Sequence, residues 1–437
     1  MNQSTPKVVE KKHLIPFIII TSLFALWGFA NDITNPMVAA FKTIMEISTA
    51  KAALVQFAFY GGYATMAIPA ALFVQKFSYK KGILLGLALY ATGALLFWPA
   101  AQYEAFGFFL VSLYILTFGL AFLETTANPF ILSLGSVQTA TRRLNLAQAF
   151  NPLGSLLGMF VASRVVLAAL DSDKHTDAAG NLVDFSTLDV ATKAMDRAHD
   201  LMVIRNPYVI LGLVVLVMFV VILMTKMPAS GHSNNIHPLQ SFRRLFNNKV
   251  YREGVIAQVF YVAAQIMCWT FIIQYAGHLG IDKATAQMYN IVAMGIFLGS
   301  RFISTLLMKY VNSRRLLMVF AMGGIVTVTG AIFIEGMAGL YCLVATSAFM
   351  SLMFPTIYGI ALGDIGEDTT LGAAGLVMAI VGGALMPPLQ GAIIDLETVG
   401  FLPAVNASFI LPLVCFVVIA RYGYRTMIFD AKAKNLI

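Results

Sequence analysis

The chain has 437 residues, of which 59% are hydrophobic and only 11% are charged, and its formal net charge is +8. A soluble domain carries roughly 25% charged residues, so this composition excludes an ordinary soluble globular protein and a disordered chain. The three cysteines, Cys268, Cys342 and Cys415, lie in apolar runs without metal-type spacing, which excludes a disulfide-built secreted protein. The basic residues lie between long apolar runs, so they indicate membrane topology rather than nucleic-acid binding.

Twelve apolar stretches are long enough to cross a bilayer, since a transmembrane helix needs about 20 mostly apolar residues. They are predicted at 15–41, 52–75, 82–100, 105–133, 143–169, 207–226, 252–276, 287–308, 316–335, 338–361, 371–395 and 400–421. The first stretch is too long for a signal peptide and contains Asn31 and Asp32. The apolar runs are continuous rather than alternating, which excludes a β-barrel. The sequence therefore predicts an all-α membrane protein.

The distribution of Lys and Arg predicts the orientation of these spans. Twelve spans place both termini on one side of the membrane, and the loops and tails of that side contain 20 of the 29 Lys and Arg residues. The loops of the opposite side contain seven, and Arg164 and Arg301 fall inside spans. Because positively charged loops stay in the cytoplasm, we expect both termini to be cytoplasmic.

Two polar segments interrupt the series of spans. Residues 170–205 are rich in Asp and are predicted to form an outer loop, whereas residues 227–250 form an inner loop that divides the spans six and six. The third span of each half opens with a basic pair, at Lys80-Lys81 and at Arg314-Arg315, which is typical of a transporter built from two repeats. We therefore expect an N-terminal six-helix bundle at 1–226, a cytoplasmic linker at 227–250 and a C-terminal six-helix bundle at 251–437.

Uncharged polar residues recur at helical spacing in two of the spans. They are Asn145, Gln148 and Asn151 in the fifth span and Gln258, Tyr261, Gln265 and Trp269 in the seventh. Such stripes either form hydrogen bonds between helices or line a water-filled cavity between the two halves. Amides match pairs of sugar hydroxyls and aromatic rings cover the apolar faces of a sugar, so a cavity of this kind predicts a sugar ligand.

Glu124 is predicted to lie deep in the fourth span, where an ionisable side chain is costly and indicates function. No basic residue falls elsewhere in that span. Burial without a cation favours the protonated carboxyl, which can donate to a sugar hydroxyl, whereas the deprotonated form leaves a buried charge. Glu124 is therefore predicted to couple proton binding to sugar binding. The alternative is a neutral Glu that is hydrogen-bonded for structure alone.

Asp32 lies in the first span and is flanked by Asn31 and Asn35. A carboxylate with two amides can form a bidentate edge for hydroxyl groups, so these three residues are predicted to bind sugar, and Asp32 is a second candidate for the proton. The alternative is that Asp32 lies near the outer mouth and is exposed to water. Arg301, in the eighth span, is predicted to be a structural partner for a carboxylate or a carbonyl.

Several strings of residues in the chain are distinctive. They include Leu123-Glu124-Thr125-Thr126-Ala127-Asn128-Pro129-Phe130, Arg143-Leu144-Asn145-Leu146-Ala147-Gln148-Ala149-Phe150-Asn151, Ala257-Gln258, Tyr261-Val262, Cys268-Trp269, Phe354-Pro355-Thr356-Ile357 and Phe77-Ser78-Tyr79-Lys80-Lys81-Gly82. These strings resemble the L-fucose–proton symporter family of the major facilitator superfamily, and the resemblance covers nearly the whole chain.

The resemblance implies twelve transmembrane helices in two pseudo-symmetric bundles and a role for Glu124 in proton-coupled sugar transport. It also implies that Gln148 and Asn151 line the sugar cavity. The glucose and galactose members of the family often carry Gln in place of the Glu, which favours a fucose-like substrate. The first-span Asp of the fucose symporter aligns with Asn35 and its upstream Asn aligns with Asp32, so it stays open which carboxyl carries the proton.

We therefore expect a proton-coupled importer of L-fucose or a related hexose that works by alternating access in a bacterial inner membrane. The expected partners are a sugar, a proton and the lipid bilayer, without a cofactor, a metal or nucleic acid, and we expect a monomer. The alternatives are a facilitative glucose or galactose uniporter, or an exporter, of the same fold. A membrane sensor or an enzyme is disfavoured, because the sequence contains no metal cluster, nucleotide loop or Ser/His/Asp arrangement.

Overall fold

The computed structural model describes residues 8–34, 37–47, 49–52, 54–172, 174–176, 183, 185–228, 238–281, 283–363, 365–394, 396 and 398–434. Twelve helical segments in these ranges are long and apolar enough to cross a membrane, by length and composition. They are Lys11–Thr34, Phe57–Lys76, Tyr79–Gln102, Phe106–Ser133, Val137–Ala169, Val190–Met224, Lys249–His278, Thr285–Leu307, Ser313–Phe333, Gly336–Ala361, Gly366–Ile394 and Ala404–Asp430. The prediction of an all-α protein with twelve spans is confirmed.

Several of these spans are built from two or more helices that follow one another with a short break. The α-helices are α1 (Leu14–Thr34), α2 (Met37–Ile44), α3 (Thr49–Ala52), α4 (Leu54–Lys76), α5 (Tyr79–Leu95), α6 (Phe97–Gln102), α7 (Phe106–Ser133), α8 (Ala140–Gln148), α9 (Phe150–Val161), α10 (Val190–Met224), α11 (Pro238–Asn247), α12 (Lys249–Thr270), α13 (Ile272–His278), α14 (Lys283–Leu307), α15 (Ser313–Phe333), α16 (Gly336–Met350), α17 (Met353–Ala361), α18 (Thr369–Met378), α19 (Gly382–Ile394), α20 (Ala404–Ser408) and α21 (Ile410–Lys434). The short 3₁₀ and π segments are η1 (Lys11–His13), η2 (Val137–Thr139), η3 (Ala162–Val166, a π-helix), η4 (Leu167–Ala169), η5 (Phe185–Thr187), η6 (Gly366–Asp368) and η7 (Ala379–Val381), and the strands are β1 (Thr398–Val399) and β2 (Leu402–Pro403).

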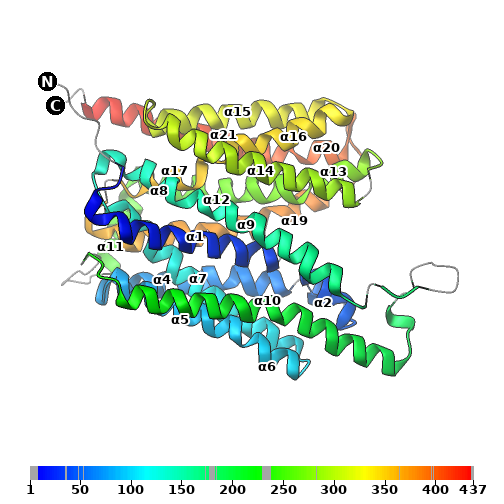
Figure 1. Cartoon of the computed structure of the whole chain (residues 1–437). Helices are drawn as coiled ribbons and strands as arrows, with labels where there is room; N and C mark the ends of the chain where they lie inside the picture. The colour runs from blue at the N-terminus through cyan, green and yellow to red at the C-terminus, as the bar shows by residue number, and fades with distance from the viewer. Residues whose placement is uncertain are drawn as a thin grey trace. The chain divides into compact units, whose positions relative to one another are not determined.

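Internal contacts divide the chain into two compact units (Figure 1). Unit 1 comprises Met1–Ile18, Asn128–Pro152 and Ser233–Ile437. Unit 2 comprises Ile19–Ala127 and Leu153–His232. The end of α7 and all of α8 therefore pack with helices from the second half of the sequence.

In unit 2 the close approach of α5 and α7 depends on small residues. A Cβ atom at Gly93 would collide with the backbone of Leu116, and one at Gly119 would collide with the backbone of Tyr90. Small residues allow transmembrane helices to approach closely, and the gain is van der Waals contact. The Tyr90 hydroxyl also donates to the backbone oxygen of Leu26 at 3.0 Å, which joins α5 to α1.

In unit 1, α15 packs on α16 and α21, and α12 packs on α17, α19 and α21. The short helix α8 packs on α14 and α17. Polar contacts also join the helices, because Asn406 Nδ2 donates to the Tyr275 hydroxyl at 2.9 Å and this hydroxyl donates to the Ala331 oxygen at 2.9 Å. Asn406 and Tyr275 thereby satisfy one another inside the spans, where a bilayer supplies no water to do so.

The prediction of a loop over the whole of 170–205 is wrong at its end, because α10 already begins at Val190. Asp189 caps this helix by accepting hydrogen bonds from the backbone N–H groups of Ala191 and Thr192, both at 3.0 Å. Leu201 and Ile204 are fully buried and hold the first part of the helix against the unit. The N-cap and this apolar face extend the helix beyond the segment that length and hydropathy identify.

Two further segments contain structure that the predictions did not specify. The linker segment 227–250 contains α11, and the Arg244 guanidinium ties this helix to Asp368 through hydrogen bonds of 2.7 Å and 2.6 Å. The last span begins at Ala404 rather than at 400, because β1 and β2 form a small antiparallel hairpin before it. Gly400, in the turn of that hairpin, has a φ of 64°, which favours glycine.

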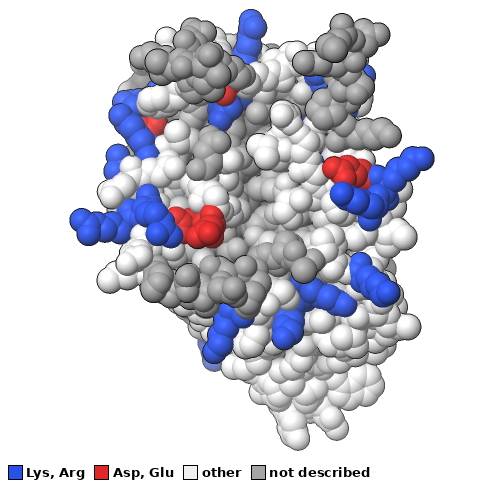
Figure 2. Space-filling model, turned by 90° about the vertical axis from the view of Figure 1, so that its left-hand side faces the viewer, with Lys and Arg blue, Asp and Glu red and all other residues white. Residues whose placement is uncertain are grey.

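Charge is unevenly distributed on the surface. On the face drawn in Figure 2, Lys and Arg side chains are more frequent than Asp and Glu side chains. Such an excess is typical of the cytoplasmic ends of membrane spans.

Candidate functional site

The two predicted acidic residues lie in unit 2, on α1 and α7. The Asp32 side chain is buried with 7% exposure, whereas Glu124 is partly exposed. Asp32 lies within electrostatic range of Tyr60, and Glu124 lies within electrostatic range of Tyr63. Tyr60 and Tyr63 are three residues apart and therefore lie on one face of α4.

The amides that were predicted to flank Asp32 are only partly defined. Asn31 is partly exposed on α1. Asn35 lies outside the described residues. The bidentate edge of Asn31, Asp32 and Asn35 therefore stays a prediction.

The polar stripe of the fifth span serves two purposes. Asn145 is fully buried, and its Nδ2 donates to the Thr356 hydroxyl of α17 at 3.1 Å, so this residue joins helices, as the alternative reading expected. Gln148, the last residue of α8, is 5% exposed and its Nε2 donates to Asn128 Oδ1 at 2.8 Å. Asn151 is partly exposed on α9. Gln148 and Asn151 stay the candidates of this stripe for sugar binding.

The polar stripe of the seventh span is mostly buried. The side chains of Gln258 and Tyr261 are fully buried on one face of α12. Both amide atoms of Gln258 and the hydroxyl of Tyr261 have no hydrogen-bond partner within the described residues. Buried polar groups without partners are uncommon in native proteins and often mark functional positions.

The remaining two residues of this stripe lie one and two turns further along α12. Gln265 is partly exposed. The Trp269 Nε1 donates to the Ser347 hydroxyl of α16 at 3.1 Å, and its ring meets that of Phe297 at a centroid distance of 5.0 Å. Trp269 is therefore held in place by α14 and α16.

Arg301 confirms the prediction of a structural partner for carbonyl groups. The residue lies on α14 with 4% exposure, and its Nε donates to the backbone oxygen of Ser351. Its Nη1 donates to the backbone oxygen of Gln148 at 3.2 Å, and the guanidinium lies over the ring of Phe297 at 4.6 Å. We call Asn128, Gln148, Arg301 and Ser351 the polar network of unit 1.

The family model of the Major Facilitator Superfamily matches residues 19–387. An L-fucose-proton symporter of Haemophilus influenzae is 67% identical over 421 residues, which cover 96% of this chain and 98% of that protein. The chain belongs to the L-fucose–proton symporter family of the major facilitator superfamily. It is therefore a membrane transporter and not an enzyme.

Two further similarities agree with this family. The crystal structure of the major facilitator transporter FucP in the outward conformation matches with a TM-score of 0.86 and 32% identity, covering 95% of this chain and 99% of that chain. A glucose/galactose transporter of Brucella abortus is 29% identical over 421 residues, which cover 95% of this chain and 94% of that protein. The fold is thus that of a major facilitator sugar transporter.

Sequence reasoning did not identify Asn128, Tyr60 and Tyr63 as neighbours of the candidate residues. A signal for Asn128 was present, because it follows Glu124 by four residues and so lies on the same face of the helix. For the two tyrosines the sequence offers spacing along α4 but no indication of which helix they face.

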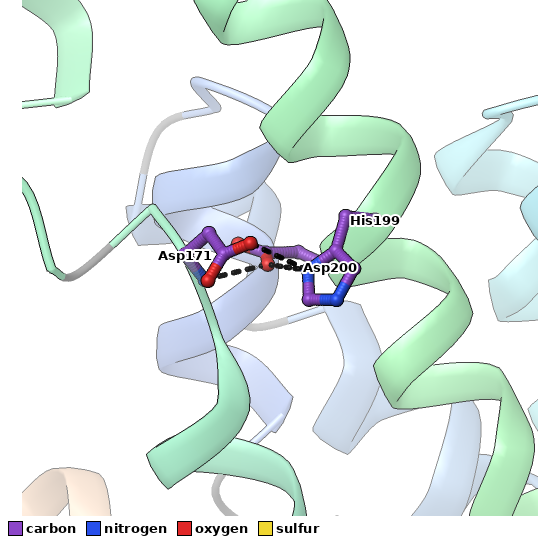
Figure 3. A group of neighbouring side chains, drawn as sticks. All are labelled: Asp171, His199 and Asp200. Carbon is purple, nitrogen blue, oxygen red and sulfur yellow. Dashed lines mark hydrogen bonds and ion pairs between the residues drawn. The ribbon is translucent and has the colours of Figure 1, made fainter.

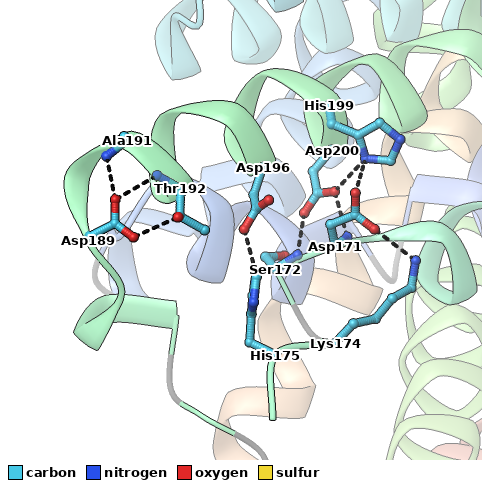
Figure 4. A network of polar contacts seen from close by, with 10 residues as sticks. All are labelled: Asp171, Ser172, Lys174, His175, Asp189, Ala191, Thr192, Asp196, His199 and Asp200. Carbon is cyan, nitrogen blue, oxygen red and sulfur yellow. Dashed lines mark hydrogen bonds and ion pairs between the residues drawn. The ribbon is translucent and has the colours of Figure 1, made fainter. Parts of the chain in front are cut away.

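A second polar cluster lies in unit 2, where the predicted outer loop meets the first turns of α10 (Figure 4). We call Asp171, His175, Asp196, His199 and Asp200 the outer cluster. The buried Asp200 carboxylate accepts hydrogen bonds from the backbone N–H groups of Asp171 at 2.7 Å and Ser172 at 3.0 Å. His175 Nε2 lies 2.6 Å from Asp196 Oδ2. These contacts tie the loop to α10.

Three members of the outer cluster are close enough to hold a metal ion (Figure 3). Ligand atoms of Asp171, His199 and Asp200 all lie within 4.8 Å of one another. His199 Nδ1 lies 3.0 Å from Asp171 Oδ2 and 3.2 Å from Asp200 Oδ1, so the imidazole already occupies the position between the carboxylates. The pKa of Asp171 is lowered, first by its hydrogen bond from Lys174 and also by the nearby His199. The cluster is explained by these internal contacts.

Proposed function

We propose that the chain imports L-fucose, or a closely related hexose, together with protons by alternating access. The observation that carries the choice of sugar is the identity of 67% to a protein named L-fucose-proton symporter, against 29% to one named glucose/galactose transporter. In alternating access the substrate site is open to one side of the membrane at a time.

The proposed sugar ligands are the polar side chains of the first, fifth and seventh spans. They are Asn31, Asp32, Asn35, Gln148, Asn151, Gln258, Tyr261, Gln265 and Trp269. Amide groups pair with adjacent sugar hydroxyls, and the aromatic rings cover the apolar C–H faces of the sugar. The buried and unpartnered amide of Gln258 supports this assignment, since a sugar hydroxyl would supply the missing hydrogen bonds.

Glu124 is the proposed proton carrier, and Asp32 is the second candidate. A carboxyl group in a membrane span is more stable when protonated, and in that form it donates a hydrogen bond to a sugar hydroxyl. The partial exposure of Glu124 supports this role, since water can deliver a proton to it. One proton that moves through 100 mV supplies about 2.3 kcal/mol, which drives accumulation of the sugar.

The proposal also includes the oligomeric state of the protein and its orientation in the membrane. We propose a monomer in the inner membrane of a bacterium, with both termini in the cytoplasm. The proposed domains are an N-terminal six-helix bundle at 1–226 and a C-terminal six-helix bundle at 251–437, and the linker at 227–250 connects them. Attachment of a fluorescent protein to each terminus tests the orientation, because green fluorescent protein folds poorly when it is exported unfolded. Fluorescence from both fusions is expected, and its absence from either would contradict the orientation.

The test of transport uses purified protein in liposomes with a pH-sensitive dye in the lumen. L-fucose, D-galactose, D-glucose and D-mannose are added separately to the wild type, Glu124→Gln, Asp32→Asn and Glu104→Gln. Glu104 makes the matched control, because it is exposed between two spans. Sugar-dependent acidification is expected for the wild type and the control, with L-fucose most effective. It should be lost in Glu124→Gln while sugar exchange survives.

The outcomes separate this mechanism from its rivals. Acidification that survives in Glu124→Gln and disappears in Asp32→Asn would move the proton to Asp32. Uptake of D-glucose or D-galactose without proton movement would identify a facilitative uniporter, the alternative that the Brucella abortus relative supports. A wild type that moves none of the four sugars would contradict the proposed substrate class.

A further inference from the structure

Two backbone oxygens in unit 1 lack the donor that a regular helix would supply. In an α-helix each carbonyl accepts from the N–H group four residues later. The residue four positions after Gln148 is Pro152, and the residue four positions after Ser351 is Pro355. Proline has no N–H group, so both carbonyls lose their helical partner. The chain breaks at these places, between α8 and α9 and between α16 and α17.

Arg301 donates to both of these oxygens. Its Nε donates to the Ser351 oxygen and its Nη1 to the Gln148 oxygen at 3.2 Å. Within the described residues Arg301 forms no ion pair with a carboxylate, so its buried charge is stabilised by carbonyl dipoles and by the ring of Phe297. A guanidinium presents several donors in a fixed plane and can therefore serve two acceptors at once.

The two breaks are adjacent to candidate sugar ligands. Gln148 is itself a proposed ligand, and its side chain is held by Asn128. Phe354, which precedes Pro355, meets the ring of Tyr261 at a centroid distance of 6.1 Å. Arg301 and Tyr261 lie within electrostatic range of each other. Arg301 is therefore close to proposed ligands on both α8 and α12.

Helices α8 and α17 are also joined on either side of this point. Asn145 Nδ2 donates to the Thr356 hydroxyl at 3.1 Å, and a Cβ atom at Gly359 would lie 2.8 Å from the Thr141 hydroxyl. These contacts bring one helix of the fifth span and one helix of the tenth span together. Arg301 extends the junction to a third helix, α14.

We propose that Arg301 is a positioning residue for sugar binding, because its guanidinium replaces the two N–H donors that Pro152 and Pro355 remove. It thereby holds Gln148 and the start of α17 at fixed positions beside Tyr261. This role deepens the proposed function and rests on it for the part that concerns sugar. The replacement of the two missing N–H donors does not depend on the proposed function, because it is inferred from the hydrogen bonds of Arg301 alone.

The test restores the missing donors. Arg301→Gln and Arg301→Lys are made in the wild type and in a Pro152→Ala/Pro355→Ala background. The melting temperature in detergent and the KM and maximal rate of L-fucose exchange in liposomes are measured for each. Pro69→Ala makes the control background, because Pro69 lies inside α4 and frees a carbonyl that Arg301 does not contact. If the double variant does not fold, Pro152→Ala and Pro355→Ala are used one at a time as backgrounds. Each of them restores one N–H donor.

In the wild-type background we expect Arg301→Gln to lower the melting temperature and to raise KM about tenfold, with a smaller change in rate. Arg301→Lys keeps the charge but lacks the planar fork, so it should raise KM about fivefold. In the Pro152→Ala/Pro355→Ala background, Arg301→Gln should lower the melting temperature by less than half as much as in the wild type. The same substitution should raise KM only about threefold or less in that background. The Pro69→Ala background should rescue neither quantity.

Equal losses in both backgrounds would overturn the proposal, since Arg301 would then act by charge or packing. Full recovery by Arg301→Lys would overturn it as well. If the carbonyl rescue is seen in melting temperature while KM never changes, the sugar-positioning part is wrong. A wild type that does not exchange L-fucose would contradict the proposed function, whereas the melting comparison would still decide how Arg301 acts on the two carbonyls.

Discussion

In the outer cluster of unit 2, carboxylates meet imidazole and ammonium groups and backbone N–H groups at the end of a helix. In the polar network of unit 1, amides and carbonyls meet one guanidinium inside membrane spans, and this guanidinium forms no ion pair within the described residues. The difference follows from the surroundings. The exposed side chains of Lys174, Asp171 and His199 can pair with little desolvation. The buried charges of Asp200 and Arg301 need hydrogen bonds from the protein, which come from backbone N–H groups for Asp200 and from carbonyls for Arg301.

The two regions can also be compared in whether their buried polar groups have hydrogen-bond partners. In the outer cluster, both oxygens of the buried Asp200 accept backbone hydrogen bonds. Near the polar network, the Gln258 amide and the Tyr261 hydroxyl have none within the described residues. A region that keeps unpaired polar groups in a membrane loses stability and is typical of a ligand site. The buried Ser172 hydroxyl beside the outer cluster also lacks a partner within the described residues, so unpaired atoms occur in both regions. Of Ser172, Gln258 and Tyr261, only the last two lie inside a membrane span, and for these two residues a sugar role is proposed above.

The largest expected effect comes from removing an unpaired group beside the polar network. Gln258→Leu replaces the amide by an apolar side chain of similar size, which should stabilise the protein by about 1–3 kcal/mol. If Gln258 binds sugar, L-fucose uptake should fall at least about tenfold. Thermal unfolding and uptake in liposomes measure the two effects.

Gln265→Leu is the matched stability control, because Gln265 lies on the same helix and is partly exposed. Its melting temperature should change little. Uptake that remains normal in Gln258→Leu would remove Gln258 from the proposed sugar ligands, and a lower melting temperature would show that the amide contributes to stability.

The next largest effect is expected from substitution of Asp200, the central carboxylate of the outer cluster. Asp200→Ala leaves the N–H groups of Asp171 and Ser172 without their acceptor, so the free energy of unfolding should fall by about 2–3 kcal/mol. Asp200→Asn keeps one acceptor oxygen and should lose roughly half as much. Sugar exchange by the folded protein should keep its KM in both variants. A raised KM would place the outer cluster in the transport site.

The smallest effect concerns Asp171, whose side chain is 42% exposed. Its pKa is lowered by Lys174 and His199, so its ion pairs stabilise the folded protein above the ordinary value of 3.8 and this contribution is lost as the pH falls below it. Solvent screens the exposed pair, and Asp171→Asn should cost less than about 1 kcal/mol at pH 7 and less still in high salt. Unfolding measured between pH 7 and pH 3 tests this sign. A cost that grows towards pH 3 would contradict it.

The sequence by itself determined the twelve spans, since an apolar run of sufficient length has no other stable place than a bilayer. It also identified Glu124, Asp32 and Arg301, because ionisable residues are rare in such runs. The family resemblance, carried by strings such as Leu123–Phe130, was confirmed by comparison with known proteins. These features depend on local composition and on short-range order along the chain.

Tertiary structure decided which of these residues meet. The sequence shows that Pro152 and Pro355 each remove a donor, but only the fold brings the two freed carbonyls to one guanidinium, 153 residues from Gln148 and 50 from Ser351. It also assigned Asn145 to helix packing and left Gln258 unpaired, although both are amides in similar stripes. Helical spacing specifies the face on which a side chain lies, whereas its partners depend on which helix packs against that face.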